Sequence, residues 1–121
     1  MRPMPNPLCH FELMTADPEG CKAFYGAVFD WKFDDASMPG YTLVNTGAEP
    51  TGAVFAKPPE VPNVCMNVYF QVTDIDATLK AAVQHGGAVL VPKTEIPNNV
   101  GHFAMIADPE GIVVGLMQPA G

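Results

Sequence analysis

The chain has 121 residues, 48% of them apolar, which is enough for one folded domain with a hydrophobic core. Thirteen acidic against six basic residues give a net charge of −7, which disfavours nucleic acid or an anionic membrane surface as a partner. No apolar run approaches the ~18 residues of a membrane span, and the N-terminal residues lack the apolar segment of a signal peptide, so we expect a cytoplasmic protein.

The first half of the chain has the pattern strand, helix, three strands. Residues 8–14 alternate between apolar and mixed positions, which predicts a strand with His10 and Glu12 on one face. Asp17 followed by Pro18 is typical of a helix start, and the apolar residues after it recur at helical spacing. The apolar residues at this spacing are Cys21, Phe24, Tyr25, Val28 and Phe29, and the pair Phe24-Tyr25 is expected to lie in the core. Three short strands are then expected at residues 31–33, 41–45 and 52–56.

The second half repeats this order after a connecting segment. Residues 57–63 contain three prolines and predict a linker. Residues 66–72 alternate like the first strand, Thr73 or Asp74 is expected to cap a second helix, and Gly86-Gly87 to end it. The remaining strands are expected at residues 88–91, 103–107 and 112–117, the last two joined by a tight turn, Asp108-Pro109-Glu110-Gly111.

The two strand-helix starts superpose with an offset of 57 residues, which matches His10 with Asn67 and Glu12 with Tyr69. Each βαβββ module is too small to bury its own apolar surface. We therefore expect one α+β domain over residues 1–121, in which a curved mixed sheet carries the helices outside and lines a cleft inside. The expected boundaries are about 7–57 for the first module, 58–65 for the linker and 66–119 for the second module.

This order of elements resembles the vicinal oxygen chelate superfamily, which includes glyoxalase I, bleomycin-resistance proteins and extradiol dioxygenases. The resemblance covers nearly the whole chain and rests on the segments AFYGAVFDW, VYFQVTDIDATLKAAVQHGGAVL and ADPEGIVVGL. It implies two βαβββ modules forming an open, incomplete mixed β-barrel, commonly in homodimers. It also implies a divalent metal ion, held by His and Glu side chains of four strands, that acts as a Lewis acid on the substrate.

The four metal-ligand positions implied by the resemblance fall on His10, near Ala56, on Asn67 and on Gly115. Only His10 is a strong ligand, whereas Zn, Ni and Fe sites typically have three or four such groups. We therefore expect no metal and no other cofactor. A divalent metal ion held by unconventional ligands is the alternative, and the further donors to consider are then Glu12, His85, Glu95 and His102.

His10 and Glu12 are the candidate catalytic residues, because their shared face should line the cleft and histidine titrates near neutrality. A histidine held by hydrogen bonds in a sheet face is the alternative reading of His10. The candidate ligand-binding residues are polar side chains at alternate positions of the two matching strands and one histidine beside a loop: His10, Glu12, Asn67, Tyr69, Gln71 and His102. A sheet edge facing plain solvent would give the same polar pattern.

The favoured function is binding of a small molecule in the cleft, of the glyoxalase or bleomycin-resistance type, without the usual metal. One alternative is a metal-dependent lyase, isomerase or dioxygenase of the same superfamily, similar to lactoylglutathione lyase. Another is a structural or regulatory dimer with a vestigial cleft, so the sequence leaves open whether the protein is an enzyme. We expect a homodimer, because an incomplete barrel exposes strand edges and an apolar rim.

Overall fold

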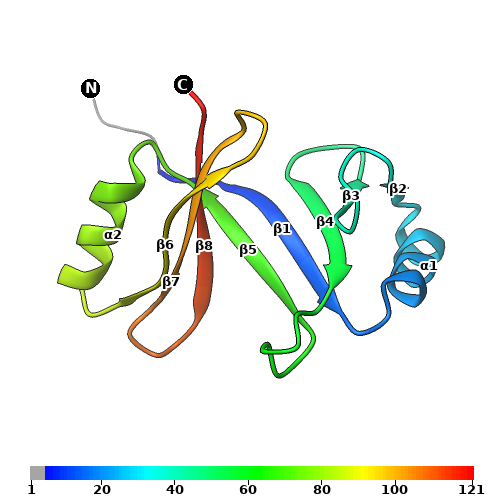
Figure 1. Ribbon diagram of the computed structural model, residues 1–121, viewed down its shortest axis with the longest axis horizontal. Helices are drawn as coiled ribbons and strands as arrows, with labels where there is room; N and C mark the ends of the chain where they lie inside the picture. The colour runs from blue at the N-terminus through cyan, green and yellow to red at the C-terminus, as the bar shows by residue number, and fades with distance from the viewer. Residues whose placement is uncertain (1–4) are drawn as a thin grey trace. The chain divides into compact units, whose positions relative to one another are not determined.

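The computed structural model describes residues 5–121 (Figure 1). The elements follow in the order β1 (Leu8–Thr15), α1 (Pro18–Phe29), β2 (Lys32–Asp34), β3 (Thr42–Asn45), β4 (Thr51–Ala56), β5 (Cys65–Gln71), α2 (Ile75–Gln84), β6 (Ala88–Ile96), β7 (Gly101–Ala107) and β8 (Val113–Pro119). The predicted succession of two βαβββ modules is confirmed.

The chain divides into two compact units. The N-terminal unit comprises residues 10–67, and the C-terminal unit comprises residues 68–121 together with the described residues before residue 10. Strands of the N-terminal unit run in the order β2-β3-β4-β1, with β1 parallel to β4 and the other pairs antiparallel. Those of the C-terminal unit run β5-β8-β7-β6, with β5 parallel to β8 and the other pairs antiparallel. The pairing is thus mixed in both units, as predicted.

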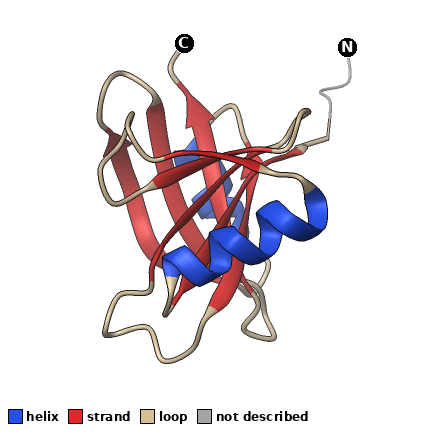
Figure 2. Cartoon of the chain, turned by 90° about the vertical axis from the view of Figure 1, so that its right-hand side faces the viewer, coloured by secondary structure: helices blue, strands red, loops and turns tan. Residues whose placement is uncertain are grey.

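Helix α1 begins as the sequence predicts. The Asp17 side chain accepts the N–H of Gly20 at 3.1 Å, and Pro18 is the first helical residue. The helix lies across the strands of its unit, in contact with β4 (Figure 2).

The predicted core position of Phe24 is wrong, whereas its neighbour Tyr25 is half-buried. No residue of α1 is buried, and Phe24, Val28 and Phe29 are 58%, 55% and 57% exposed. Contact with the strands is instead aromatic, because Tyr25 stacks on Trp31 at a centroid distance of 5.1 Å and Trp31 lies 5.5 Å from the ring of Phe11. The helix therefore packs at this cluster, and much of its apolar surface faces outward.

The C-terminal unit has a conventional core between helix and strands. Val72, Ile75, Ala104 and Leu116 are each at most 3% exposed, and Leu79 and Ile106 pack against them. Asp74 caps α2 by accepting the N–H of Ala77 at 3.2 Å, as one of the two predicted caps. Helix α2 therefore covers the face of β7 and β8 that carries Ala104 and Leu116.

Strand β6 is longer than predicted. It continues through Pro92 to Ile96, with register shifts against β7 between Val89 and Val91 and between Val91 and Thr94. Proline lacks an N–H, but it is tolerated on an edge strand or beside a bulge. Since β6 is last in the strand order of its unit, Pro92 does not end the strand.

The hairpin of β7 and β8 closes on the predicted turn. The side chain of Asp108 accepts the N–H groups of Glu110 and Ile112 at 2.9 and 2.8 Å, and Gly111 adopts a φ of +97°. The carboxylate of Asp108 therefore has a structural role in this turn. Neither helix within residues 5–121 has the length and apolar character needed to cross a membrane.

Candidate functional site

His10 lies at the centre of a hydrogen-bond network in the N-terminal unit. It is only 7% exposed, and its Nδ1 lies 2.7 Å from the Thr51 hydroxyl and its Nε2 2.8 Å from the Tyr41 hydroxyl. The Tyr41 hydroxyl donates to the carboxylate of Glu12 at 2.6 Å. The two predicted catalytic residues, His10 and Glu12, are therefore joined through Tyr41.

The strand register explains why these side chains meet. His10 on β1 is paired with Thr51 on the parallel strand β4, and residues paired in this way point to the same face. Glu12 is two positions along β1 and shares that face. Tyr41 precedes β3, and its ring stacks on Phe55 of β4 at a centroid distance of 5.4 Å, which holds its hydroxyl over the strand pair.

Hydrogen-bond donors and acceptors in the network can be assigned from the number of protons. The Tyr41 hydroxyl has one proton, which it donates to Glu12, so the Nε2–H of His10 must donate to the Tyr41 oxygen. Burial lowers the pKa of His10, and the attraction of the Glu12 carboxylate offsets part of this effect. The ring is therefore neutral near pH 7, and in that state its Nδ1 accepts the proton of the Thr51 hydroxyl.

Tyr41 and Thr51 were missed by the sequence analysis. Alternation along residues 41–45 does place Tyr41 on one face with Leu43 and Asn45, which is a signal that was present in the sequence. What the sequence does not state is that this face meets the face of His10. That depends on the pairing of β1 with β4 and of β4 with β3.

The predicted ligand contacts on β5 share a face by alternation. Tyr69 is 6% exposed and is paired with Gly115 of β8, whereas Asn67 is half-buried and Gln71 is exposed. A Cβ at Gly115 would lie 2.2 Å from the Tyr69 ring, so the ring covers the strand at this glycine. Tyr69 therefore lies on the face of the C-terminal unit opposite to the face that carries Leu116 and the core.

His102 lies on the other face of the C-terminal unit. Its partner across the strands is Gln118, and the Gln118 side chain accepts the N–H of Ile75 at the start of α2 at 2.8 Å. His102 therefore shares the face that α2 covers. The structure does not bring it together with Tyr69.

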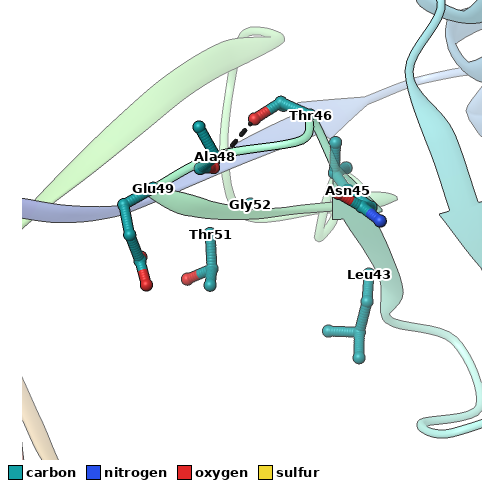
Figure 3. A pocket seen from close by; sticks show the side chains of 8 residues that line it. Leu43, Asn45, Thr46, Ala48, Glu49, Thr51 and Gly52 are labelled. Atoms are coloured by element: carbon teal, nitrogen blue, oxygen red, sulfur yellow. Dashed lines mark hydrogen bonds between the residues drawn. The ribbon is translucent and has the colours of Figure 1, made fainter.

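A cavity of about 490 Å³ opens at the hairpin of β3 and β4 (Figure 3). It is lined by Leu43, Val44, Asn45, Thr46, Ala48, Glu49, Thr51 and Gly52. Figure 3 shows the side chains of Leu43, Glu49 and Thr51 pointing to the same side of the hairpin. The volume is in the range of small-molecule sites. Because Thr51 also contacts His10, the cavity and the hydrogen-bond network share a residue.

Comparison with known proteins identifies the family. Residues 8–116 match the model of the Glyoxalase/Bleomycin resistance protein/Dioxygenase superfamily. The chain belongs to this superfamily. It is 34% identical over 114 residues to "Putative glyoxylase CFP32" of Mycobacterium bovis, an alignment that covers 88% of this chain and 43% of CFP32. The chain therefore spans less than half the length of that curated relative.

Other relatives extend the comparison to one further sequence and to solved structures. A "Glyoxylase-like domain-containing protein" of Didymella fabae is 28% identical over 107 residues, which cover 83% of this chain and 84% of that protein. Methylmalonyl-CoA epimerase of Mycobacterium tuberculosis superposes with a TM-score of 0.71 at 15% identity, covering 94% of this chain and 88% of that one. Hypothetical protein BH1468 of Bacillus halodurans gives 0.70 at 12% identity, with 96% of each chain covered. The predicted glyoxalase-type α+β fold is confirmed.

The residues present do not fit the metal site implied by the superfamily. Both ring nitrogens of His10 are bonded to neutral side chains, so a metal ion would have to displace one of them. On β4 the face of Thr51 continues with Ala53 and Phe55, while Ala56 points to the other face. None of these side chains is a metal ligand comparable to His, Cys or a carboxylate.

The remaining implied positions offer no better donors. Asn67 is a weak neutral ligand, and a ligating side chain at Gly115 has no room beside the Tyr69 ring. Across residues 5–121, no three His, Cys, Asp or Glu side chains gather into a group that could hold a metal ion. His10 is hydrogen-bonded to Tyr41 and Thr51, and Glu12 is linked to it through Tyr41.

Proposed function

We propose that this superfamily member binds a small molecule at the face of the N-terminal unit that carries His10, and that it does so without the superfamily's metal. The observation that carries this proposal is the engagement of both His10 nitrogens by Tyr41 and Thr51. A histidine held in this way is saturated by protein hydrogen bonds. The cavity beside Thr51 supplies a space of suitable size for the bound molecule.

The network supports contact with polar atoms of a ligand and, as a further step, proton exchange. A neutral His10 can accept a proton at Nδ1 when the Thr51 hydroxyl turns from donor to acceptor, and the Glu12 carboxylate stabilises the charged ring that results. His10 and Glu12 are therefore proposed as the acid-base pair, with Tyr41 linking them. Asn67, Tyr69 and Gln71 stay predicted ligand contacts, on the basis of their shared face of β5.

A metal-dependent lyase, isomerase or dioxygenase is the second candidate function. It is favoured by the 34% identity with CFP32, whose name describes a glyoxylase. In that case His10 would give up its bond to Tyr41 or Thr51, and the remaining metal ligands would come from residues outside the four implied positions.

Elemental analysis separates the two functions. We expect protein purified without chelators to contain far less than one Zn, Ni, Fe or Mn ion per chain, and added metal to produce no glyoxalase I activity. His10→Ala should leave the low metal content unchanged, as should the control His85→Ala at the end of α2. About one metal per chain, released by His10→Ala and retained by His85→Ala, would establish the metal-dependent enzyme instead.

We also propose that the protein forms a homodimer. The support is the number of large apolar side chains that are more than half exposed: Phe24, Val28, Phe29, Val64, Met66, Val83, Leu90 and Ile112. Light scattering at micromolar concentration should give about twice the chain mass of 12.9 kDa. A monomer mass alone would contradict this proposal.

A further inference from the structure

The lining of the cavity at the β3–β4 hairpin is negatively charged. Glu49 is the charged residue in its lining, and the other lining residues are neutral. The Glu49 side chain extends to the same side as Thr51 and Leu43 (Figure 3). A ligand in this cavity therefore meets one carboxylate, one hydroxyl and an apolar side chain.

The basic groups on the strands next to the hairpin, Lys32 on β2 and His10 on β1, do not reverse this charge. Lys32 is paired with Asn45 in the strand register, but its ammonium lies 2.9 Å from the carboxylate of Asp30. His10, which contacts the cavity through Thr51, is kept neutral by its burial. The whole chain carries a net charge of −7, so its overall field also disfavours anions.

Internal hydrogen bonds use up part of the polar lining. The side-chain oxygen of Asn45 accepts the N–H of Gly47 at 2.8 Å, and the Thr46 hydroxyl donates to the carbonyl of Ala48 at 3.1 Å. These bonds hold the loop between the two strands. What they leave toward a ligand is the NH₂ group of Asn45 as a donor and the Glu49 carboxylate as an acceptor.

We propose that the ligand class of this site is a small amphiphilic cation, whose protonated amine lies at Glu49 and whose apolar part lies on Leu43. This rests on the proposed function and narrows it. Glu49 accepts hydrogen bonds from the ammonium, Asn45 donates to a nearby oxygen of the ligand, and Thr51 connects the bound molecule to His10. Molecules whose charge is carried by carboxylate or phosphate groups are disfavoured.

Three probes of one shape test the charge preference. 3-Phenylpropylamine, 3-phenylpropanol and 3-phenylpropanoate are titrated into the full chain at pH 7 and low salt, and the backbone amides of Leu43, Glu49 and Thr51 are followed by NMR. We expect the amine to bind about three- to tenfold more tightly than the alcohol, and the carboxylate more weakly than both, as for a partly exposed ion pair. Salt at ~0.15 M should narrow the difference.

Two charge-matched variants locate the effect. Glu49→Gln keeps the shape and a hydrogen-bond acceptor but removes the charge, so the amine should then bind like the alcohol. Glu60→Gln changes the net charge equally at an exposed position of the same unit and should retain the preference.

Each other outcome contradicts a defined part of the inference. If the carboxylate binds at these amides as tightly as the amine, or if Glu49→Gln keeps the preference, the charge selection is wrong while small-molecule binding stands. If the probes shift only the amides around His10 and Tyr41, the site stands but the ligand does not extend into the cavity. If none of these amides shifts at millimolar probe, this cavity is not the ligand site, and the metal analysis still decides the proposed function independently.

Discussion

The two units have the same βαβββ order but use their buried space differently. In the C-terminal unit, α2 covers an apolar core, and its first residue, Ile75, is completely buried. In the N-terminal unit, α1 contributes no buried residue, and the buried side chains include the polar His10 and Thr42. The repeated backbone pattern thus does not determine which kinds of side chain are buried in each unit. The C-terminal unit has a core covered by its helix, and the N-terminal unit has the hydrogen-bond network and the cavity.

The same steric device appears in both units on opposite faces. A Cβ at Gly52 would lie 2.2 Å from the Phe11 ring, and one at Gly115 would lie 2.2 Å from the Tyr69 ring. Phe11 contacts Trp31 and so faces α1, whereas Tyr69 lies on the face away from α2. In each case the first strand of the module presses an aromatic ring onto a glycine of the last strand. The glycine is required by this close approach.

The largest expected effect is removal of the side chain that anchors α2. Ile75→Ala should lower the free energy of unfolding by about 2–5 kcal/mol, because it leaves a cavity in a core that has no exposed surface at this point. Val28→Ala in α1 is the matched comparison, and at 55% exposure in its own chain it should cost clearly less than Ile75→Ala, even where dimer formation covers Val28. Urea unfolding at fixed protein concentration measures both. Equal losses of unfolding free energy would show that α1 and α2 contribute alike to stability, which would contradict the difference between the two units.

The second effect concerns the glycine under Tyr69. Gly115→Ala should destabilise the protein by about 1–3 kcal/mol, because the new methyl group overlaps the ring and the well-packed strands must shift. In a Tyr69→Ala background the same substitution should cost almost nothing, since the ring is gone. A double-mutant cycle gives the coupling. Additive costs for the two changes would mean that the ring does not determine the need for glycine.

The fold was largely predictable from the sequence, because the relevant signals are local. Alternation identified the strands, and Asp17-Pro18 and Asp74 identified the helix starts. The continuation of β6 beyond Pro92 was missed, since proline ends a strand only when the strand is not at an edge. The exposure of Phe24 was also missed, because helical spacing shows which residues share a face and not how closely that face is covered.

The candidate site was predictable only in part. His10 and Glu12 are two positions apart on one strand, so their shared face follows from alternation alone. Thr51 and Tyr41 lie 41 and 31 residues from His10 in sequence, and their contacts depend on strand register. Periodicity does not give the register between distant strands. The placement of His102 on the α2 face likewise depends on its pairing with Gln118.

The third effect tests the network that distinguishes the N-terminal unit. Tyr41→Phe removes one hydroxyl that serves both His10 and Glu12, so the unfolding free energy should fall by about 1–3 kcal/mol. Tyr25→Phe is the control, because the ring of Tyr25 contacts Phe24, Phe29 and Trp31 and a phenylalanine ring should keep these contacts. Similar small losses of unfolding free energy in both variants would show that the hydrogen bonds of the Tyr41 hydroxyl contribute little to stability.

The smallest effect is a dependence of stability on pH. Burial lowers the pKa of folded His10 below the value of about 6.5 that applies in the unfolded chain, with attraction by Glu12 offsetting part of the shift. Between the folded pKa and about pH 6.5 the unfolded chain binds more protons than the folded chain. The stability that neutral His10 contributes is therefore complete above pH 6.5 and is lost as the pH falls through that window. Wild type should therefore lose more unfolding free energy than His10→Gln between pH 7.5 and pH 5. Glu12→Gln removes the offsetting attraction, so in that variant the ring resonance of His10 should titrate at still lower pH by NMR. Titration of wild-type His10 at or above pH 6.5 would show that its charged form is favoured, and the neutral ring assigned to the network would then be wrong.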